Sequence, residues 1–572
     1  MIFYRWKIFH LSLLFFIILL IYGHTLSVPF YLDDYSSIVE NELIRNFNLW
    51  GIFWDVPLRF IPNLSFAIHF FIHDISLAPY HIVNITIHFL ASVGIYFFIL
   101  GIIISLSRNT SYFISQQDFF LPLITALLFA CHPLQTQAVT YIVQRIASMA
   151  ALFYILSLTF YMYYRLSERS YKKQILIILS LLCAVLAFFT KQNTATLPLS
   201  ILLIEYFFFN NRKRVIYMFF GMFGALIVIL SSLYVIPIIQ KTLLIYPKLG
   251  SDLSHYEYFS TQIIVIWIYI IKFFFPYSIN FDYDIEVVKS ILEMKVFCAL
   301  IGHLVLIIAA FRIRKVFSII AFSIIYYYLT HMIESGLFPI TDLCFEHRTY
   351  LPNLGICIVL GWSMLRIIHT RLKFGIIFSC CIFVVLSFLT YQRNMEWKYP
   401  EVFWKKNIQY TPFKLRPWNE LGKHYLSKKQ FNDAYEVFIH AFELLSEENS
   451  SMKKKMNVPV IANLIIILHH AGKTKEALSM ANLILQYPMQ KIHRYYILNT
   501  IGNIYYEYGY YKQAELWYRR AISIMPNDPL AMIGLANTLK KLLKTSEYIK
   551  IKKIIKKLNN DISKDNRLYF KK

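Results

Sequence analysis

The sequence has few cysteines, and they show no pattern that would pair them. Seven occur in 572 residues. A disulfide framework or a thiolate metal site needs cysteines at paired or closely spaced loop positions. Only Cys344 falls in a loop, whereas the others lie within or at the edge of apolar runs: Cys131, Cys183, Cys298, Cys357, Cys380 and Cys381. Neither kind of site is therefore indicated. The sequence also lacks the G-x-x-x-x-G-K-[ST] phosphate loop and the Rossmann fingerprint.

Acidic residues are scarce as well, with 33 Asp and Glu against 57 Lys and Arg, which gives a net charge of +24. Such a balance can indicate nucleic-acid binding. Here the basic residues lie largely in short loops between apolar runs and in a polar C-terminal third, so topology and surface solvation explain them without nucleic acid. With 57% hydrophobic residues and repeated apolar runs of about 15 to 25 residues, the chain is predicted to be an all-α polytopic membrane protein.

Basic loops predict the topology, because cytoplasmic loops carry an excess of Lys and Arg. The first run, flanked by Arg5 and Lys7, has no evident cleavage site and is interpreted as a retained span. Eleven spans then place the basic clusters inside: 8–23, 82–106, 119–135, 148–165, 174–190, 194–210, 215–238, 293–311, 316–333, 351–368 and 373–391. The run 261–276 would reverse the parity, so we interpret it as re-entrant or interfacial, with a short crossing as the alternative.

The chain changes character after Tyr391, where the apolar runs stop. We predict a membrane domain at 1–391 and a second domain at 392–572. In the second, Trp418, Leu421, Gly422 and Tyr425, followed by Ala434, Phe438 and Ala441, match the spacing of a tetratricopeptide repeat, and the frame returns near Ile501. About three repeats and a capping helix are expected, on the same side of the membrane as most acids.

Ionisable groups gather at the outer edge of the predicted bundle, where each is costly and needs a partner or a cavity. Asp33 and Asp34 stand side by side just beyond the first span. The cations Arg145, Lys191 and Arg348, with His347, suit a phosphate-bearing lipid, and a carboxylate at the rim can take a proton from an attacking hydroxyl. Further candidates for one outward polar chamber are Arg59, His132, Gln135, Gln137, Asp282, Asp284 and Glu346.

Several short strings in this order resemble the GT-C glycosyltransferases, above all the transmembrane and tetratricopeptide-repeat O-mannosyltransferases and their bacterial relatives. The strings are FYLDD (30–34), RFIPNLSF (59–66), HIVNITIH (81–88), HPLQTQAV (132–139), YIVQR (141–145), TKQN (190–193), NFDYD (280–284) and EHRTYLP (346–352). The resemblance implies Asp33 or Asp34 as general base and an inverting transfer of mannose or another hexose from a polyprenyl phosphate. Gln192 stands where the family often has Glu, which leaves Lys191 as a phosphate ligand.

Other interpretations stay open. The paired acids could solvate or cap a helix end, the polar strings could pack between helices, and Arg348 could pair locally with Glu346. Asp282 and Asp284 could hold a divalent cation, although this spacing is common in loops; no other cofactor is expected. A carrier or lipid flippase would fit the span number, but we see no internal symmetry. A membrane-anchored repeat scaffold without catalysis is the third alternative.

The repeats offer a concave surface suited to a peptide, so a protein Ser or Thr is the favoured acceptor, with a glycan or a lipid as alternatives. The expected partners are thus a polyprenyl-phosphate sugar, a protein or peptide, and membrane lipid. We favour a bacterial inner membrane with the repeats in the periplasm over an endoplasmic reticulum membrane with the repeats in the lumen.

Overall fold

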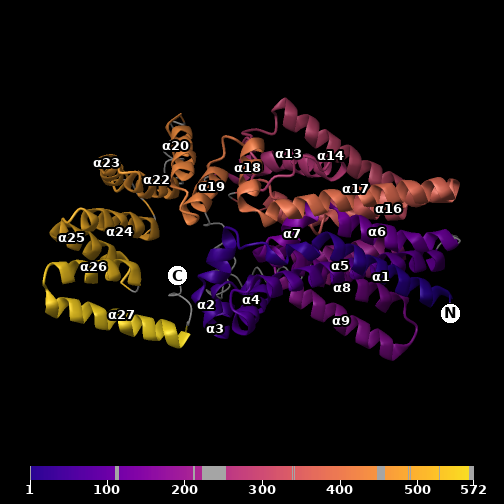
Figure 1. Cartoon of the computed structure of the whole chain (residues 1–572). Helices are drawn as coiled ribbons and strands as arrows, with labels where there is room; N and C mark the ends of the chain where they lie inside the picture. The colour runs from indigo at the N-terminus through magenta and orange to yellow at the C-terminus, as the bar shows by residue number, and fades with distance from the viewer. Residues whose placement is uncertain are drawn as a thin grey trace. The chain divides into compact units, whose positions relative to one another are not determined.

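The computed structural model describes residues 2–109, 115–209, 213–221, 253–337, 339–340, 342–447, 458–486, 489, 491–526 and 528–565. It divides into two compact units, Met1–Tyr399 and Pro400–Lys572. Every regular element in these ranges is helical (Figure 1), so the all-α prediction is confirmed. The first unit ends at Tyr399, eight residues beyond the boundary expected at 391, because its last helix continues to Lys398.

The first unit is built from long apolar helices connected by short helices and loops. The long ones are α1 (Ile2–Tyr22), α4 (Phe60–His73), α5 (Leu77–Asn109), α6 (Phe120–Cys131), α8 (Arg145–Leu166), α9 (Ser170–Phe188), α13 (His255–Phe274), α14 (Met294–Ile313), α15 (Ser318–His331), α16 (Asn353–Thr370) and α17 (Leu372–Lys398). The short ones include α2 (Glu42–Arg45), α3 (Leu49–Asp55), α7 (Thr136–Thr140) and α10 (Leu197–Ile204).

Eight helices of the described chain are long and apolar enough to cross a membrane, or nine if a bent pair counts as one span. The count of eleven is therefore not confirmed. The expected span 194–210 is broken into a 3-10 turn, α10 and a π turn, and most of 215–238 lies outside the described residues. The segment 261–276, interpreted as re-entrant or interfacial, lies mostly in the continuous helix α13, which is itself among the eight.

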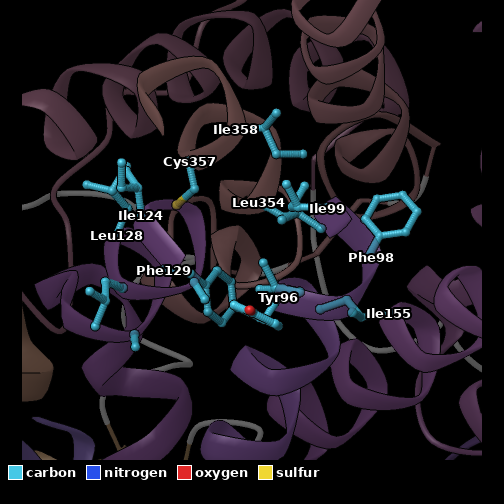
Figure 2. Packing of buried hydrophobic residues seen from close by; sticks show 14 of the residues in the cluster. Tyr96, Phe98, Ile99, Ile124, Leu128, Phe129, Ile155, Leu354, Cys357 and Ile358 are labelled. Atoms are coloured by element: carbon cyan, nitrogen blue, oxygen red, sulfur yellow. The ribbon is translucent and has the colours of Figure 1, made fainter. Parts of the chain in front are cut away.

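The core of the first unit lies where α5, α6, α8 and α16 meet (Figure 2). Phe98, Phe129, Ile155 and Leu354 are among its buried side chains. Lipid tails are as apolar as these residues, so close packing rather than expulsion of water holds such helices together. Gly355 illustrates the fit, because a Cβ there would lie 2.6 Å from the Ser323 carbonyl oxygen on α15.

The second unit is a run of paired helices. They are α18 (Pro400–Tyr410), α19 (Leu415–Ser427), α20 (Phe431–Glu447), α22 (Val458–His470), α23 (Thr474–Ile484), α24 (Lys491–Glu507), α25 (Tyr511–Ile524), α26 (Pro529–Lys541) and α27 (Thr545–Asp565). Gly422 lets Phe438 approach α19, and Gly502 lets Tyr518 approach α24 in the same way. The repeated small residue thus sits where paired helices touch, as expected for tetratricopeptide repeats. The expected capping element is a further pair, α26 and α27.

Candidate active site

The segment 132–145, called the hub segment below, breaks the path from α6 to α8. The helical pieces before and after His132 are bent by 58°. His132 is extended, with φ −78° and ψ 128°, and Pro133 opens a 3-10 turn after it. The His132 Nδ1 accepts from the Leu134 N–H at 3.2 Å and so caps that turn. The hub segment therefore exposes a series of polar groups to neighbouring segments, which an unbroken span would not do.

Asp34 is fully buried and is held by the backbone of two segments. Its Oδ2 accepts from the Tyr31 N–H at 2.9 Å, and its Oδ1 accepts from the Val143 N–H at 2.7 Å. Burial raises the pKa of Asp34 well above its ordinary value, although the two N–H donors and Arg145 oppose the shift. Both carboxylate oxygens are thus occupied in fixing the first loop to the hub segment.

Asp33 differs from its neighbour because its side chain is exposed. Its backbone N–H donates to the Tyr141 hydroxyl at 2.9 Å. The residue before it, Leu32, has φ +34°, a left-handed conformation that costs a non-glycine residue free energy. The structure therefore divides the acidic pair: Asp34 is buried and anchors the backbone, whereas Asp33 is exposed and contacts Tyr141 through its backbone N–H.

Arg145 opens α8 and is fully buried. Its Nε donates to Asn84 Oδ1 at 2.7 Å, and its terminal nitrogens donate to Ser65 Oγ at 3.2 Å and to the Tyr80 carbonyl at 3.0 Å. The guanidinium also lies 4.6 Å from the centre of the Phe66 ring. Arg145 thus ties α4 and α5 to the hub segment, and its observed contacts are those of a positioning residue.

Gln137 connects the hub segment to the 3-10 turn Glu346–Thr349. Its Oε1 accepts from the His347 backbone N–H at 2.8 Å and lies 3.1 Å from His347 Nδ1. The His347 ring also stacks on Phe345, with centres 5.2 Å apart. Because Oε1 only accepts, Nδ1 carries the proton in the neutral ring, and Nε2 is the nitrogen left for a ligand.

Four positively charged or ionisable groups converge from distant parts of the sequence, and we call them the cation group: Arg59, Lys191, His347 and Arg348. Burial and then the charges of the other three members hold the pKa of His347 well below its ordinary value. Lys191 is buried, and its Nζ lies 2.6 Å from Glu334 Oε1. Burial lowers the pKa of Lys191, and Glu334 opposes that shift. Such a concentration of positive charge favours an anionic ligand.

Arg348 is held at the edge of the cation group by carbonyl oxygens of its own loop. Its terminal nitrogens donate to the Asp342 carbonyl at 2.6 Å and to the Leu343 carbonyl at 3.4 Å. The side chain is 4% exposed. The alternative considered above, a local pair of Arg348 with Glu346, is not among the ion pairs of the described residues.

Glu346 faces a different set of groups from those around its neighbour His347. Its Oε1 accepts from the Tyr283 hydroxyl at 2.9 Å. Burial raises the pKa of Glu346 to about 7, while Arg393, Tyr283 and Lys272 oppose the shift. The neighbouring Asp282 is buried and Asp284 is exposed, so those two carboxylates do not share one environment. The described part of the chain has no group of three or more His, Cys, Asp or Glu suited to a metal ion.

Two other chamber candidates are fully enclosed. His132 donates from Nε2 to the Phe273 carbonyl at 2.8 Å and stacks on the Phe273 ring at 4.0 Å, so both of its nitrogens are occupied. Gln135 is buried, and its amide oxygen and nitrogen have no hydrogen-bond partner in the described ranges. His132 therefore joins the hub segment to α13, whereas Gln135 retains its full capacity to bond.

The last turns of α17 contribute residues that the sequence reasoning did not assign to the site. The Tyr31 hydroxyl donates to the Trp397 carbonyl at 2.7 Å, and the Trp397 indole stacks on Tyr141 at 5.7 Å. Arg393 forms a buried ion pair with Glu396 at 2.7 Å. The polar string QRNMEW (392–397), which directly follows the last apolar run, was the available signal.

Comparison with known proteins agrees with the resemblance predicted from the sequence. A tetratricopeptide-repeat family model matches residues 495–528, which cover most of α24 and α25. The chain is 21% identical to the human protein O-mannosyl-transferase TMTC3 over 91% of its own length, and 23% identical to a protein O-mannosyl-transferase of Caenorhabditis elegans over 74%. It spans 61% of the length of each of these relatives.

A shorter and closer match joins the chain to the human protein O-mannosyl-transferase TMTC2. The two are 31% identical over 157 residues, which are 25% of this chain and 17% of that relative. The resemblance to transmembrane and tetratricopeptide-repeat O-mannosyltransferases is thus confirmed.

Proposed function

We propose that the chain is a membrane glycosyltransferase that moves mannose or another hexose from a polyprenyl-phosphate donor to a Ser or Thr hydroxyl of a protein, with inversion. The observation that carries this proposal is the hub segment itself. Gln137 holds His347 of the cation group, and Tyr141, one helical turn further on, holds the Asp33 backbone. The residue with the exposed carboxylate and a member of the cation group are thereby attached to the same hub segment, at the helix α7 and at the residue directly after it.

In the proposed reaction the acceptor oxygen attacks the anomeric carbon, and its proton passes to the Asp33 carboxylate. The bond between the anomeric carbon and the phosphate oxygen breaks as the new glycosidic bond forms. The phosphate has one negative charge in the donor diester and gains a second as it leaves. The cation group, with His347 protonated, would stabilise the transition state, in which this second charge grows, more strongly than the ground state. Such preferential stabilisation of the transition state is the condition for catalysis.

Asp34 and Arg145 receive positioning roles in this proposal. Asp34 has both oxygens engaged by backbone N–H groups, and Arg145 is engaged by Asn84, Ser65 and Tyr80. A donor phosphate would therefore meet the cation group rather than Arg145. A divalent cation near Asp282 and Asp284 stays an open alternative, which transfer in the presence of EDTA would test. The compartment, a bacterial inner membrane or the endoplasmic reticulum, stays a prediction.

The test is sugar transfer in membranes that contain the full chain, with radiolabelled polyprenyl-phosphate mannose or glucose and a Ser/Thr-rich peptide. We expect transfer by the wild type and by Asp55→Asn, an exposed acid of the same loop, and loss of transfer by Asp33→Asn. Inversion predicts a product whose anomeric configuration, measured by NMR, is opposite to that of the donor. Absence of transfer from every donor would instead favour a carrier or a scaffold.

A further inference from the structure

The second unit contains a cavity of about 700 Å³ on the side formed by the first helices of successive repeats, α19, α22 and α24. Four asparagines line it: Asn419, Asn463, Asn499 and Asn503. No charged cluster of one sign and no continuous apolar surface accompanies them among the described lining residues. Carboxamide groups are thus the polar groups that recur in the lining of the groove from one repeat to the next.

These amides follow the repeat frame. Asn419 lies three residues before Gly422, and Asn499 lies three residues before Gly502. Both glycines are the positions where an aromatic ring of the paired helix approaches. The two asparagines thus occupy equivalent positions in two repeats, and Asn463 of the repeat between them lines the same cavity. A ligand that crosses the groove would meet amides in each of the three repeats.

The ionic groups of the groove pair with one another. Lys423 Nζ lies 2.9 Å from Glu420 Oε2, and His469 Nε2 lies 2.8 Å from Glu507 Oε2. The Lys423–Glu420 pair, with one exposed partner, contributes little to stability but reduces the net charge that a ligand would meet. The His469–Glu507 contact does so only when the imidazole is protonated. The groove has little electrostatic preference for a charged ligand, which leaves hydrogen bonding as its main means of recognition.

Several amides are held in place and still have bonding capacity. Asn463 Nδ2 donates to Asn419 Oδ1 at 3.0 Å, and the Tyr518 hydroxyl donates to Asn503 Oδ1 at 2.7 Å. These contacts leave Asn463 Oδ1 as an acceptor and Asn503 Nδ2 as a donor. Asn499 Oδ1 is shielded from solvent and has no partner within the described part of the chain. The groove therefore presents acceptors and donors in oriented positions.

From this we infer that the groove binds an extended polypeptide through its main-chain peptide groups, largely independently of its side chains. Each peptide group has one N–H donor and one carbonyl acceptor, the same pair that a carboxamide offers in return. That this polypeptide is the glycosylation acceptor rests on the proposed function. Recognition of the main chain would let one enzyme present Ser and Thr residues from many different sequences.

The first test measures binding by the full chain in detergent micelles, followed by the fluorescence anisotropy of a labelled, unglycosylated Ser/Thr-containing peptide. We expect Asn499→Ala and Asn499→Ala/Asn503→Ala to weaken binding by at least about tenfold. Leu516→Ala, at an exposed position of α25 outside the lining, should leave it unchanged. The thermal unfolding midpoint of each variant verifies that the fold is retained.

The second test uses only the wild-type chain and so does not depend on the folding of a variant. A peptide of scrambled sequence should bind within about threefold of the original, whereas N-methylation of alternate main-chain nitrogens should reduce binding by at least about tenfold. The inference would be overturned if the scrambled sequence weakened binding at least about tenfold while N-methylation left it within about threefold. Displacement of the peptide by an oligosaccharide would overturn it as well.

These experiments test peptide binding and sugar transfer separately, so either proposal can be overturned without the other. Asp33→Asn should bind the peptide as well as the wild type while losing transfer. Peptide binding that depends on the asparagines, without transfer from any donor, would overturn the proposed function and retain the groove as a peptide site. Transfer to peptide that is indifferent to Asn499 and Asn503, with KM unchanged, would overturn the groove inference alone.

Discussion

The Val143 backbone N–H donates to Oδ1 of Asp34 at 2.7 Å, and this bond joins the loop after α1 to the 3-10 turn before α8. Replacing Asp34 by asparagine should cost stability. The asparagine side chain has one acceptor oxygen, whereas two backbone N–H groups need acceptors at this position. The two members of the acidic pair should therefore respond differently to the same substitution.

We predict that Asp34→Asn lowers the free energy of unfolding by about 1–3 kcal/mol, the cost of a buried donor without a partner. Asp33→Asn should leave the unfolding midpoint unchanged and reduce transfer by about 10²- to 10⁴-fold, because it removes the proposed general base. Thermal unfolding in detergent and initial transfer rates measure the two effects. Equal loss of stability in both variants would contradict the division of roles.

The buried pair of Lys191 and Glu334 permits a double-mutant test. Lys191→Met should destabilise the chain by about 3–5 kcal/mol because Glu334 is left buried without its cationic partner. Glu334→Gln should destabilise it by a similar amount because the Lys191 charge is then left buried without its anionic partner. The double variant should recover most of the stability, since no unpaired charge remains, but should still transfer sugar poorly because the cation group has lost a member. Recovery of both properties would show that Lys191 does not act on the donor.

Stability should depend on pH through Glu346. Its folded pKa of about 7 lies above the ordinary value of 4.5, so the folded state binds the proton more tightly than the unfolded state. Stability is therefore full below about pH 4.5 and declines as the pH rises to about 7, by up to about 3 kcal/mol. Glu346→Gln, which stays neutral, should remove that decline, as unfolding midpoints between pH 5 and 8 would reveal.

Donor affinity should depend on pH through His347. Burial, and then the neighbouring cations, hold its pKa low in the free protein, and a bound phosphate would raise that pKa by favouring imidazolium. Donor binding should thus take up a proton and tighten as the pH falls, up to about tenfold per unit. Gln137→Leu, which removes the acceptor for the ring and the backbone of His347, should weaken binding and flatten this dependence. A pH-independent Kd for the wild type would exclude His347 as a phosphate ligand.

Much of the fold could be predicted because apolar length and repeat spacing are local properties of the chain. The runs that became α1, α5, α9, α14, α16 and α17 were recognised from composition, and the positions of Gly422 and Gly502 revealed the repeat pairs. At 261–276 the parity of charged loops was used to decide the form of a segment, and the structure shows that most of this segment is one continuous helix, α13. The prediction also counted 194–210 as a span, although backbone breaks inside an apolar run leave little trace in hydropathy.

The candidate site was only partly accessible from the sequence. The sequence alone determined which chemical groups are available at the membrane edge: an acidic pair after the first span, cations in short polar strings, and trailing repeats. Only the tertiary structure decided which of them meet, since contacts between residues such as Gln137 and His347, or Tyr31 and Trp397, join positions hundreds of residues apart. It also separated Asp33 from Asp34, because burial and hydrogen bonding depend on the surrounding fold, and two neighbouring residues of the same type have no intrinsic difference that a sequence could record.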